Sequence, residues 1–325
     1  MTRYLVTGAA GFIGRSIAKR LLEDGHSVRG IDNLSTGKLE NLEGLDGIDF
    51  TAADITDAGA MDKACDGVDV IFHEAALASV PRSVKDPIAS NHANVTGTLQ
   101  VLNAAKNAKV RRVIFAASSS AYGDTPTLPK REDMLPNPIS PYAVAKLACE
   151  HYMKSFYRVY GLETVSIRYF NVFGPYQDPS SQYSGVLAKF IPQMLRGETP
   201  TIYGDGEQSR DFTFIENVVK ANLLAANAPA EQVAGKMFNV AMGSRVTLNE
   251  TVEILRKITG YEGPVNHAAE RTGDVKHSLA DINAAKHAFG YEPSVNFEEG
   301  LRRTVDWYRK AVVAVPTAAG QSGKA

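Results

Sequence analysis

The chain has few cysteines, no long apolar run and almost no net charge. Only Cys65 and Cys149 occur in 325 residues, and their spacing fits neither a metal site nor a redox motif, so we expect two small buried thiols. No stretch approaches the roughly 20 apolar residues of a membrane span, and no signal peptide is expected, which predicts a cytoplasmic protein without a membrane partner. A net charge of −1 without a basic stripe argues against nucleic acid as a partner.

What the first half does contain is a regular alternation of short β-branched runs and helical patterns. Strands are expected at 4–7, 27–31, 48–52, 68–72, 113–117 and 164–169. Helices are expected at about 13–22, 58–65, 94–108 and 141–160. Strand–helix alternation implies right-handed crossovers and a parallel sheet. The sequence therefore predicts an α/β fold with a doubly wound parallel (Rossmann) sheet.

The pattern changes after residue 172, where residues 174–182 are rich in Pro, Gly, Ser and Tyr and predict a loop. Shorter helices follow, near 186–196, 217–226, 248–259 and 297–308. We therefore predict a second, smaller mixed α/β domain for the substrate. The expected domains are 1–172 with about 214–242 for the dinucleotide, 173–213 with 243–312 for the substrate, and a disordered tail at 313–325.

Three evenly spaced glycines join the first strand to the first helix. Gly8 allows the tight turn, Gly11 lets the backbone approach a pyrophosphate, and Gly14 lets the helix pack closely on the strand. The helix N-terminus beyond them offers free N–H groups and a partial positive charge. A glycine-rich turn alone is a weak signal, but a strand before it and an apolar-periodic helix after it predict a dinucleotide site. No Gly-Lys-Ser/Thr follows, which excludes a P-loop.

Asp32 ends the second strand about 20 residues further on, where a ribose-binding carboxylate is expected. A carboxylate accepts hydrogen bonds from a free ribose 2′-hydroxyl but repels a 2′-phosphate, which favours NAD over NADP. Asp54 ends the third strand and is either an adenine ligand or a solvated strand-end residue. The residues predicted to bind the cofactor are Gly8, Gly11, Phe12, Ile13, Gly14, Asp32, Asn33, Asp54, Ile55, Ala75, Tyr142 and Lys146.

Tyr142 and Lys146 stand four apart at the start of a helical run, so both side chains project from one face. A phenol with a reference pKa of about 10 is a poor base near neutral pH. A neighbouring ammonium and a positive nicotinamide ring would lower that pKa, so the tyrosine could take a proton from a sugar hydroxyl. The spacing alone also suits an amphipathic surface pair. The serines at 118–120, at the carboxyl edge of the expected sheet, favour the catalytic interpretation, and which serine acts stays open.

These features together resemble the extended short-chain dehydrogenase/reductase family of NAD-dependent epimerases and dehydratases, and within it the UDP-glucose and UDP-N-acetylglucosamine 4-epimerases. The resemblance extends over about residues 3 to 310. Its motifs are Gly8-x-x-Gly11-x-x-Gly14, Asp32, His73-Glu74-Ala75-Ala76, the serines 118–120, Tyr142-x-x-x-Lys146 and Arg168-Tyr169-Phe170-Asn171.

The resemblance implies a catalytic role for four of these residues. Tyr142 would be the base, Lys146 its partner and a ligand of the nicotinamide ribose, and Ser118 the hydroxyl that assists, with Ser120 as the alternative. Related dehydratases carry an Asp-Glu pair after this hydroxyl. Ser119 and Ser120 stand there in this chain and cannot supply the carboxylates that elimination needs, so a dehydratase is disfavoured.

The same resemblance implies where the substrate binds. The substrate residues would be Ser79, Ser118 and Asn171 near the sugar and diphosphate, Tyr203 at the uracil, Arg210 and Arg271 at the diphosphate, Asp274 at the ribose, and Ser278 beside the sugar C2 substituent. Guanidinium groups suit bidentate phosphate contacts. Serine at 278 would leave room for an N-acetyl group, unless it is an exposed serine without consequence.

The sequence therefore predicts NAD-dependent 4-epimerisation of a UDP-hexose, plain or N-acetylated, through a transient 4-keto sugar. Two alternatives stay open: a UDP-glucuronate 4-epimerase or decarboxylase, and a non-catalytic dinucleotide-binding protein. The resemblance also implies a homodimer joined through helices around 94–109 and 142–160, although their apolar faces could equally be buried within one subunit.

Overall fold

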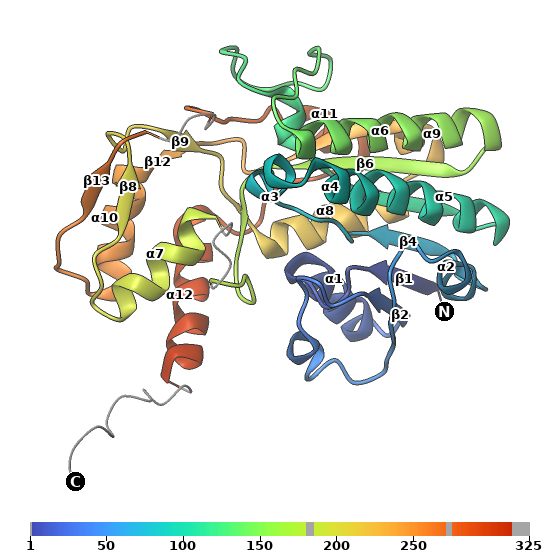
Figure 1. The fold of residues 1–325 in the computed structure, drawn as a ribbon, viewed down its shortest axis with the longest axis horizontal. Coiled ribbons are helices and arrows are strands. Elements are labelled where there is room, and N and C mark those ends of the chain that lie inside the picture. The colour runs from blue at the N-terminus through green and yellow to red at the C-terminus, as the bar shows by residue number, and fades with distance from the viewer. Residues whose placement is uncertain (1, 180–184, 271–274, 314–325) are drawn as a thin grey trace, which may run out of the picture.

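The computed structural model of the chain describes residues 2–179, 185–270 and 275–313 (Figure 1). At its centre is a seven-stranded sheet of order β11-β6-β5-β4-β1-β2-β3, in which every neighbouring pair is parallel. The strands are β1 (Arg3–Thr7), β2 (Ser27–Asp32), β3 (Ile48–Ala52), β4 (Val70–His73), β5 (Arg112–Ser118), β6 (Glu163–Tyr169) and β11 (Lys236–Val240). This order confirms the predicted α/β fold with a parallel Rossmann-like sheet.

Helices cover both faces of the sheet, because successive strand residues point to opposite sides. Tyr4 and Val6 of β1 join one apolar core, whereas Leu5 between them joins the other. The first core includes side chains of α1 (Phe12–Glu23) and α8 (Ile215–Asn227). The second includes side chains of α2 (Ala58–Cys65), α5 (Gly97–Asn107) and α6 (Pro141–Tyr160). Both cysteines are free and buried in the second core, as predicted.

Helix α6 spans the residues that the sequence predicts for it. Ser140 caps its start by accepting a hydrogen bond from the Ala143 N–H at 3.2 Å, and Pro141 occupies the first turn, where its missing N–H has no cost. Gly161 ends it in the left-handed conformation with φ 72°. Tyr142 therefore lies in the first turn, near the carboxyl end of β5.

The remaining elements form a smaller mixed lobe beside the sheet (Figure 1). Its helices are α7 (Val186–Leu195), α10 (Leu248–Thr259) and α12 (Phe297–Val313). Its two-residue or three-residue strands pair as β7 (Val172–Phe173) with β10 (Thr213–Phe214), β8 (Thr201–Tyr203) with β13 (Asn266–Ala268), and β9 (Ser209–Arg210) with β12 (Val246–Thr247). Helix α11 (Asn283–Phe289) instead packs against the sheet edge, where the Phe289 ring centre lies 5.1 Å from that of Phe238 in β11. The fold is completed by the short helices α3 (Val80–Lys85), α4 (Pro87–Asn91) and α9 (Ala230–Val233), a π-helical turn (His92–Thr96) and two 3₁₀ turns (Leu39–Leu42 and Ser119–Tyr122).

The exact domain limits stay a prediction, although β11 does return to the sheet from the second half of the chain. The tail expected at 313–325 lies outside the described residues, apart from Val313. Among the helices that are described, none has the length and apolarity to cross a bilayer.

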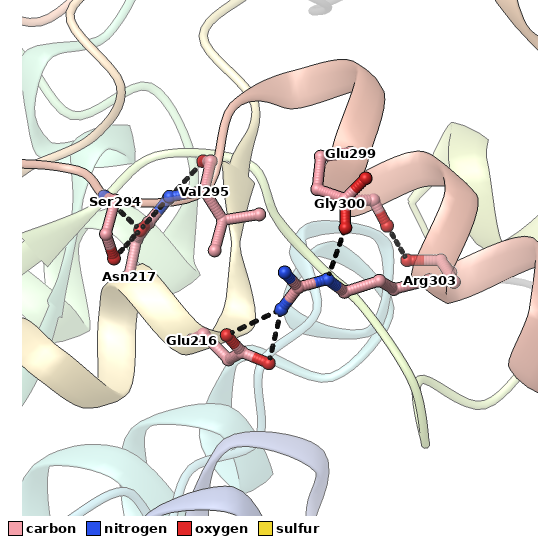
Figure 2. Close-up of polar contacts among 8 residues, drawn as sticks. Glu216, Asn217, Ser294, Val295, Glu299, Gly300 and Arg303 are labelled. Atoms are coloured by element: carbon pink, nitrogen blue, oxygen red, sulfur yellow. Dashed lines mark hydrogen bonds and ion pairs between the residues drawn. The ribbon is translucent and has the colours of Figure 1, made fainter.

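The lobe is joined to the sheet through the start of α8 (Figure 2). Asn217 is fully buried: its Nδ2 donates to the Val295 carbonyl at 2.7 Å, and its Oδ1 accepts from the Ser294 and Val295 N–H groups at 2.9 and 3.1 Å. Beside it, Arg303 of α12 pairs with Glu216 at 2.9 Å. The exposed ion pair contributes little to stability, whereas loss of the buried Asn217 amide would leave buried backbone groups without hydrogen-bond partners. Asn217 is thus the main polar anchor between α8 and the segment that precedes α12.

Candidate active site

The cofactor residues predicted from the sequence, other than Tyr142 and Lys146, line one cavity at the carboxyl ends of β1 to β4. They are Gly8, Gly11, Phe12, Ile13, Gly14, Asp32, Asn33, Asp54, Ile55 and Ala75. Ser35, Thr36 and Glu74 also line it and were not predicted. The carboxyl edge of a parallel sheet is where ligands bind in this architecture.

The glycines are required by close approaches of backbone to backbone. A Cβ on Gly14 would lie 2.1 Å from the Gly8 carbonyl oxygen, and one on Gly8, whose φ is 69°, would lie 2.8 Å from the Ala75 nitrogen. Gly11 begins α1 without any side-chain cap. The first N–H groups of α1 are therefore left for a ligand, which fits a pyrophosphate.

Asp32 is held as a buried acceptor at the end of β2. Its Oδ2 accepts from the Ala10 N–H at 3.0 Å and its Oδ1 from the Leu34 N–H at 2.8 Å. Burial raises the pKa of Asp32, while these two hydrogen bonds oppose that change. Each carboxylate oxygen keeps a further lone pair, which suits the predicted contact with ribose hydroxyls.

Asp54 is not a free strand-end residue. Asn33 donates to its Oδ2 at 2.6 Å, and the Thr56 N–H and hydroxyl donate to its Oδ1 at 2.8 and 2.7 Å. Burial alone would raise the pKa of Asp54, but the hydrogen bonds from Thr56 and Asn33 outweigh it and lower the pKa. An ionised acceptor in this cavity is suited to the adenine amino group.

Ser118 stands between the tyrosine and the second candidate serine. It is the last residue of β5, and its hydroxyl lies close enough to the Tyr142 phenol to lower the pKa of that phenol. Ser120 donates to the Ser118 Oγ from its own hydroxyl at 2.8 Å and from its N–H at 3.2 Å. The phenol is therefore next to Ser118, and Ser120 lies one hydrogen bond further away. This arrangement favours Ser118 as the assisting hydroxyl.

Lys146 is buried beneath the site rather than paired with the phenol. Its side chain lies in α6 at 3% exposure, and its Nζ donates to the Ala116 carbonyl at 2.7 Å. The Nζ also lies 4.7 Å from the centre of the Phe115 ring. Burial lowers the pKa of Lys146, while Cys149, Glu74 and Glu150 oppose the change.

The expectation that Lys146 lowers the pKa of Tyr142 is not met within the chain itself. Burial raises the pKa of Tyr142 to about 12, the hydrogen bond with Ser118 offsets only part of this, and Lys146 is not among the groups that shift it. The physical reason is that the ammonium is directed to Ala116. The protein alone keeps the phenol protonated, so a lower pKa needs positive charge brought beside it by a ligand.

Glu74 is a polar residue of the site to which the sequence assigned no role. Its Oε1 accepts from the Tyr169 hydroxyl at 2.9 Å, and its Oε2 is buried without a hydrogen-bond partner. Burial raises the pKa of Glu74 to about 7, opposed by Tyr169 and Lys146. The sequence feature that could have identified Glu74 is a carboxylate directly after the apolar run of β4, within the motif His73-Glu74-Ala75-Ala76.

Three of the predicted substrate residues line a second cavity, between β7, α7, β8 and β9. Asn171, Tyr203 and Arg210 contribute polar groups there, beside an apolar wall that includes Phe190 and Phe212. Asn171 has φ 35°, and its Nδ2 donates to the Asp211 carbonyl at 3.1 Å and to the Ser278 Oγ at 3.0 Å. The Ser278 side chain is thus in contact with Asn171, and its Oγ also accepts from the Asp211 N–H at 3.3 Å. Arg271 and Asp274 lie outside the described residues.

A third cavity, the connecting cavity, lies between the dinucleotide cavity and the second cavity. It shares Gly11, Phe12, Ser35, Thr36, Ala76 and Ala78 with the dinucleotide cavity, and Val172, Gln177 and Gly185 with the second one. Ser79 lines it, and the Ser79 Oγ also caps α3 by accepting from the Arg82 N–H at 3.1 Å. The three cavities therefore adjoin one another between the glycine turn and Arg210.

A glycine-lined cavity lies at the edge of the parallel sheet, beside a serine–tyrosine pair and an adjoining polar cavity. This combination is typical of a dinucleotide-dependent enzyme. Residues 4–241 match the model of the NAD dependent epimerase/dehydratase family, and the chain belongs to that family. It is 41% identical over 312 residues to a UDP-glucose 4-epimerase of Mycolicibacterium smegmatis, covering 94% of this chain and 98% of the relative.

Solved structures agree with this assignment. A UDP-N-acetylglucosamine 4-epimerase from Methanobrevibacter ruminantium, in complex with UDP-N-acetylmuramic acid, superposes with a TM-score of 0.91 at 43% identity, over 95% of this chain and 99% of that one. A UDP-glucose 4-epimerase from Thermus thermophilus in complex with NAD does so with a TM-score of 0.87 at 36% identity, over 95% and 100%. The protein is a nucleotide-sugar 4-epimerase-family enzyme, and its cofactor is NAD.

Proposed function

We propose that the enzyme interconverts the C4 epimers of UDP-hexoses, UDP-glucose with UDP-galactose, and also accepts the N-acetylated pair. The observation that carries the proposal is the closeness of the Ser118 and Tyr142 side chains at the carboxyl edge of the sheet, beside a dinucleotide cavity and the adjoining cavities that reach Asn171 and Arg210. Relatives named for UDP-glucose and UDP-N-acetylglucosamine 4-epimerisation at 41% and 43% identity support the same substrates.

Bound NAD supplies a hydride acceptor and donor for C4 of the sugar. Tyr142 accepts the proton of the O4 hydroxyl as the C4–H bond breaks and returns it to O4 after the 4-keto sugar has presented its other face. Ser118 shares a hydrogen bond with the same oxygen and keeps it in line with the phenol. Lys146 contributes its charge to the buried site and is placed to contact the nicotinamide ribose.

Inversion at C4 requires that the enzyme binds the nucleotide part of the substrate firmly and leaves the sugar able to rotate. Arg210 and Asn171 in the second cavity are proposed diphosphate contacts, Tyr203 flanks the uracil, and Ser79 approaches the sugar. Arg271 and Asp274 are proposed as further contacts. Contacts concentrated on the nucleotide allow the 4-keto sugar to rotate while the nucleotide stays bound.

The proposal is tested by incubating the purified full chain with one UDP-sugar at a time and following the products by NMR. UDP-glucose, UDP-galactose and their N-acetyl forms should each be converted to the C4 epimer, and UDP-glucuronate serves as the comparison. Conversion of UDP-glucuronate alone would assign the enzyme to uronates, and no conversion of any of the five would dismiss the epimerase proposal.

Ser278 should decide how well N-acetylated sugars are used. Tyrosine at this position is expected to crowd the C2 substituent, so Ser278→Tyr should lower kcat/KM for UDP-N-acetylglucosamine relative to UDP-glucose by about tenfold or more. Turnover of UDP-glucose by the same variant is the internal control for folding. A ratio equal to that of the unchanged enzyme would show that residue 278 does not gate the substrate.

We also propose a homodimer joined through α6 and the helices beside it. The outer face of α6 leaves Val144, Tyr152, Val159 and Tyr160 exposed, with Val159 at 66%. Exposed apolar residues along one helix are typical of a surface that a partner covers. Sedimentation velocity should give twice the mass of one chain, and a monomer at micromolar concentration would contradict the proposal.

A further inference from the structure

Residues 174–179 form a strap across the connecting cavity. Tyr176, Gln177, Asp178 and Pro179 line that cavity from the side of the lobe, opposite Gly11, Phe12 and residues 34–38 on the sheet side. The cavity continues directly into the dinucleotide site through shared residues such as Gly11 and Phe12. The strap therefore lines a space that adjoins the cofactor cavity.

Arg15 lies under the strap as a buried cation without a carboxylate. It follows Gly14 in α1, is 4% exposed, and forms no ion pair within the described residues. Its Nε is buried without a hydrogen-bond partner. Its guanidinium carbon lies 3.5 Å from the centre of the Tyr176 ring. Burial lowers the pKa of Arg15, while Tyr176 and, more weakly, the charge of Glu23 oppose that change.

Tyr176 is held in a conformation that a non-glycine residue rarely adopts. Its φ is 69°, in the left-handed region. Its ring centre also lies 4.9 Å from that of Trp307 in α12, with the two rings tilted by 46°, so the ring is packed between α1 and α12. Strained backbone persists where surrounding contacts over-determine it. Here those contacts come from the helix that begins the pyrophosphate site and from the helix that closes the lobe.

The two ends of the strap are fixed as well. At its start, a Cβ on Gly174 would lie 2.5 Å from the Ile215 Cγ2, so the backbone is pressed against α8. Further along, Asp178 pairs with Lys38 at 3.0 Å, in the loop that follows the ribose-binding strand β2. Trp307 is positioned by α12, which Arg303 and the Asn217 anchor join to α8 (Figure 2). The strap is thus fastened to both walls of the cavity.

We propose that Tyr176 is a positioning residue that retains NAD: packed between Arg15 and Trp307, it keeps the strap closed beside the dinucleotide cavity and slows the departure of the cofactor. Opening the strap would separate the ring from Arg15 and lose this cation–π contact. The closed state is therefore favoured by a contact that the open state lacks. The inference rests on NAD as the cofactor and is independent of which sugar is the substrate.

The test measures how fast NAD leaves the full chain. Protein loaded with NAD is diluted into alcohol dehydrogenase and ethanol, and released NAD is recorded as absorbance at 340 nm. Tyr176→Leu should release NAD about tenfold faster, because the ring face is lost. Tyr176→Phe keeps that face and should release NAD at nearly the unchanged rate. Lys38→Ala, which removes an exposed ion pair, should have a smaller effect in the same direction.

The matched control is Lys286→Ala, which removes the comparably exposed pair Lys286–Glu292, 2.7 Å apart. Its NAD release and its UDP affinity, measured by calorimetry, should both be unchanged. Tyr176→Leu should keep its UDP affinity, which a general disruption of the lobe would lower. Should that variant fail to fold, Arg15→Met removes the other half of the stack and should also release NAD faster.

Unchanged release from folded Tyr176→Leu or Arg15→Met would overturn the inference while leaving the epimerase proposal standing. Faster release from Tyr176→Phe as well as Tyr176→Leu would also overturn it, since the ring face would then not be the retaining contact. An unchanged chain that binds no NAD would overturn both.

Discussion

Tyr142→Phe should lower UDP-hexose turnover by about 10²- to 10⁴-fold, the range that loss of a general base or acid typically produces. The phenol is the group next to Ser118 at the edge of the sheet, and removing its hydroxyl leaves no group in that position to accept the O4 proton. NAD content should be unchanged, because every residue that lines the dinucleotide cavity is left intact. Initial rates followed by NMR, with NAD quantified in the same preparation, provide the measurement.

Tyr152→Phe is the matched control, since it removes one hydroxyl from the same helix at a partly exposed position. It should retain full turnover. Full turnover by Tyr142→Phe would refute the assignment of the base, whereas a loss that accompanies loss of NAD would point to a structural role.

Gly14→Ala should abolish NAD binding or lower the affinity at least tenfold. The added methyl would lie 2.1 Å from the Gly8 carbonyl oxygen, a backbone atom that can yield only if the turn and α1 separate. That separation moves the uncapped helix N-terminus away from the pyrophosphate. Calorimetric titration of NAD into cofactor-free protein measures the change.

Gly59→Ala is the control for adding a methyl group to a helix. A Cβ on Gly59 meets nothing closer than 3.5 Å, so NAD affinity should be unchanged and stability equal or slightly higher. Wild-type affinity in Gly14→Ala would mean that the glycine turn does not form the cofactor site.

Much of the fold was predictable because the strongest signals are local and repeated. The capped span of α6, with Ser140 before it and Gly161 after it, follows from residue types alone. Strand β11 was not predicted as a strand, since its position at the sheet edge depends on pairing with β6 far away in the chain. The two-residue strands of the lobe are too short to show any alternation.

The same distinction between local and long-range signals applies to the candidate site. The glycine turn and Asp32 were predictable because close backbone contact and strand-end position constrain residue type directly. The direction of the Lys146 side chain and the raised pKa of Tyr142 were not predictable, because both depend on how deeply α6 packs against β5. The stack of Arg15 on Tyr176 joins two distant segments, and neither carries a local motif.

The most direct test of the mechanism is the ionisation of Tyr142 in the NAD-bound protein. The difference in phenolate absorbance between the unchanged enzyme and Tyr142→Phe, recorded against pH, isolates this one ring from the other tyrosines. Bound NAD⁺ places positive charge near the phenol, so its pKa should fall well below the value of about 12 that the protein alone imposes. A phenol that still ionises only near pH 12 with NAD bound would contradict its role as the base.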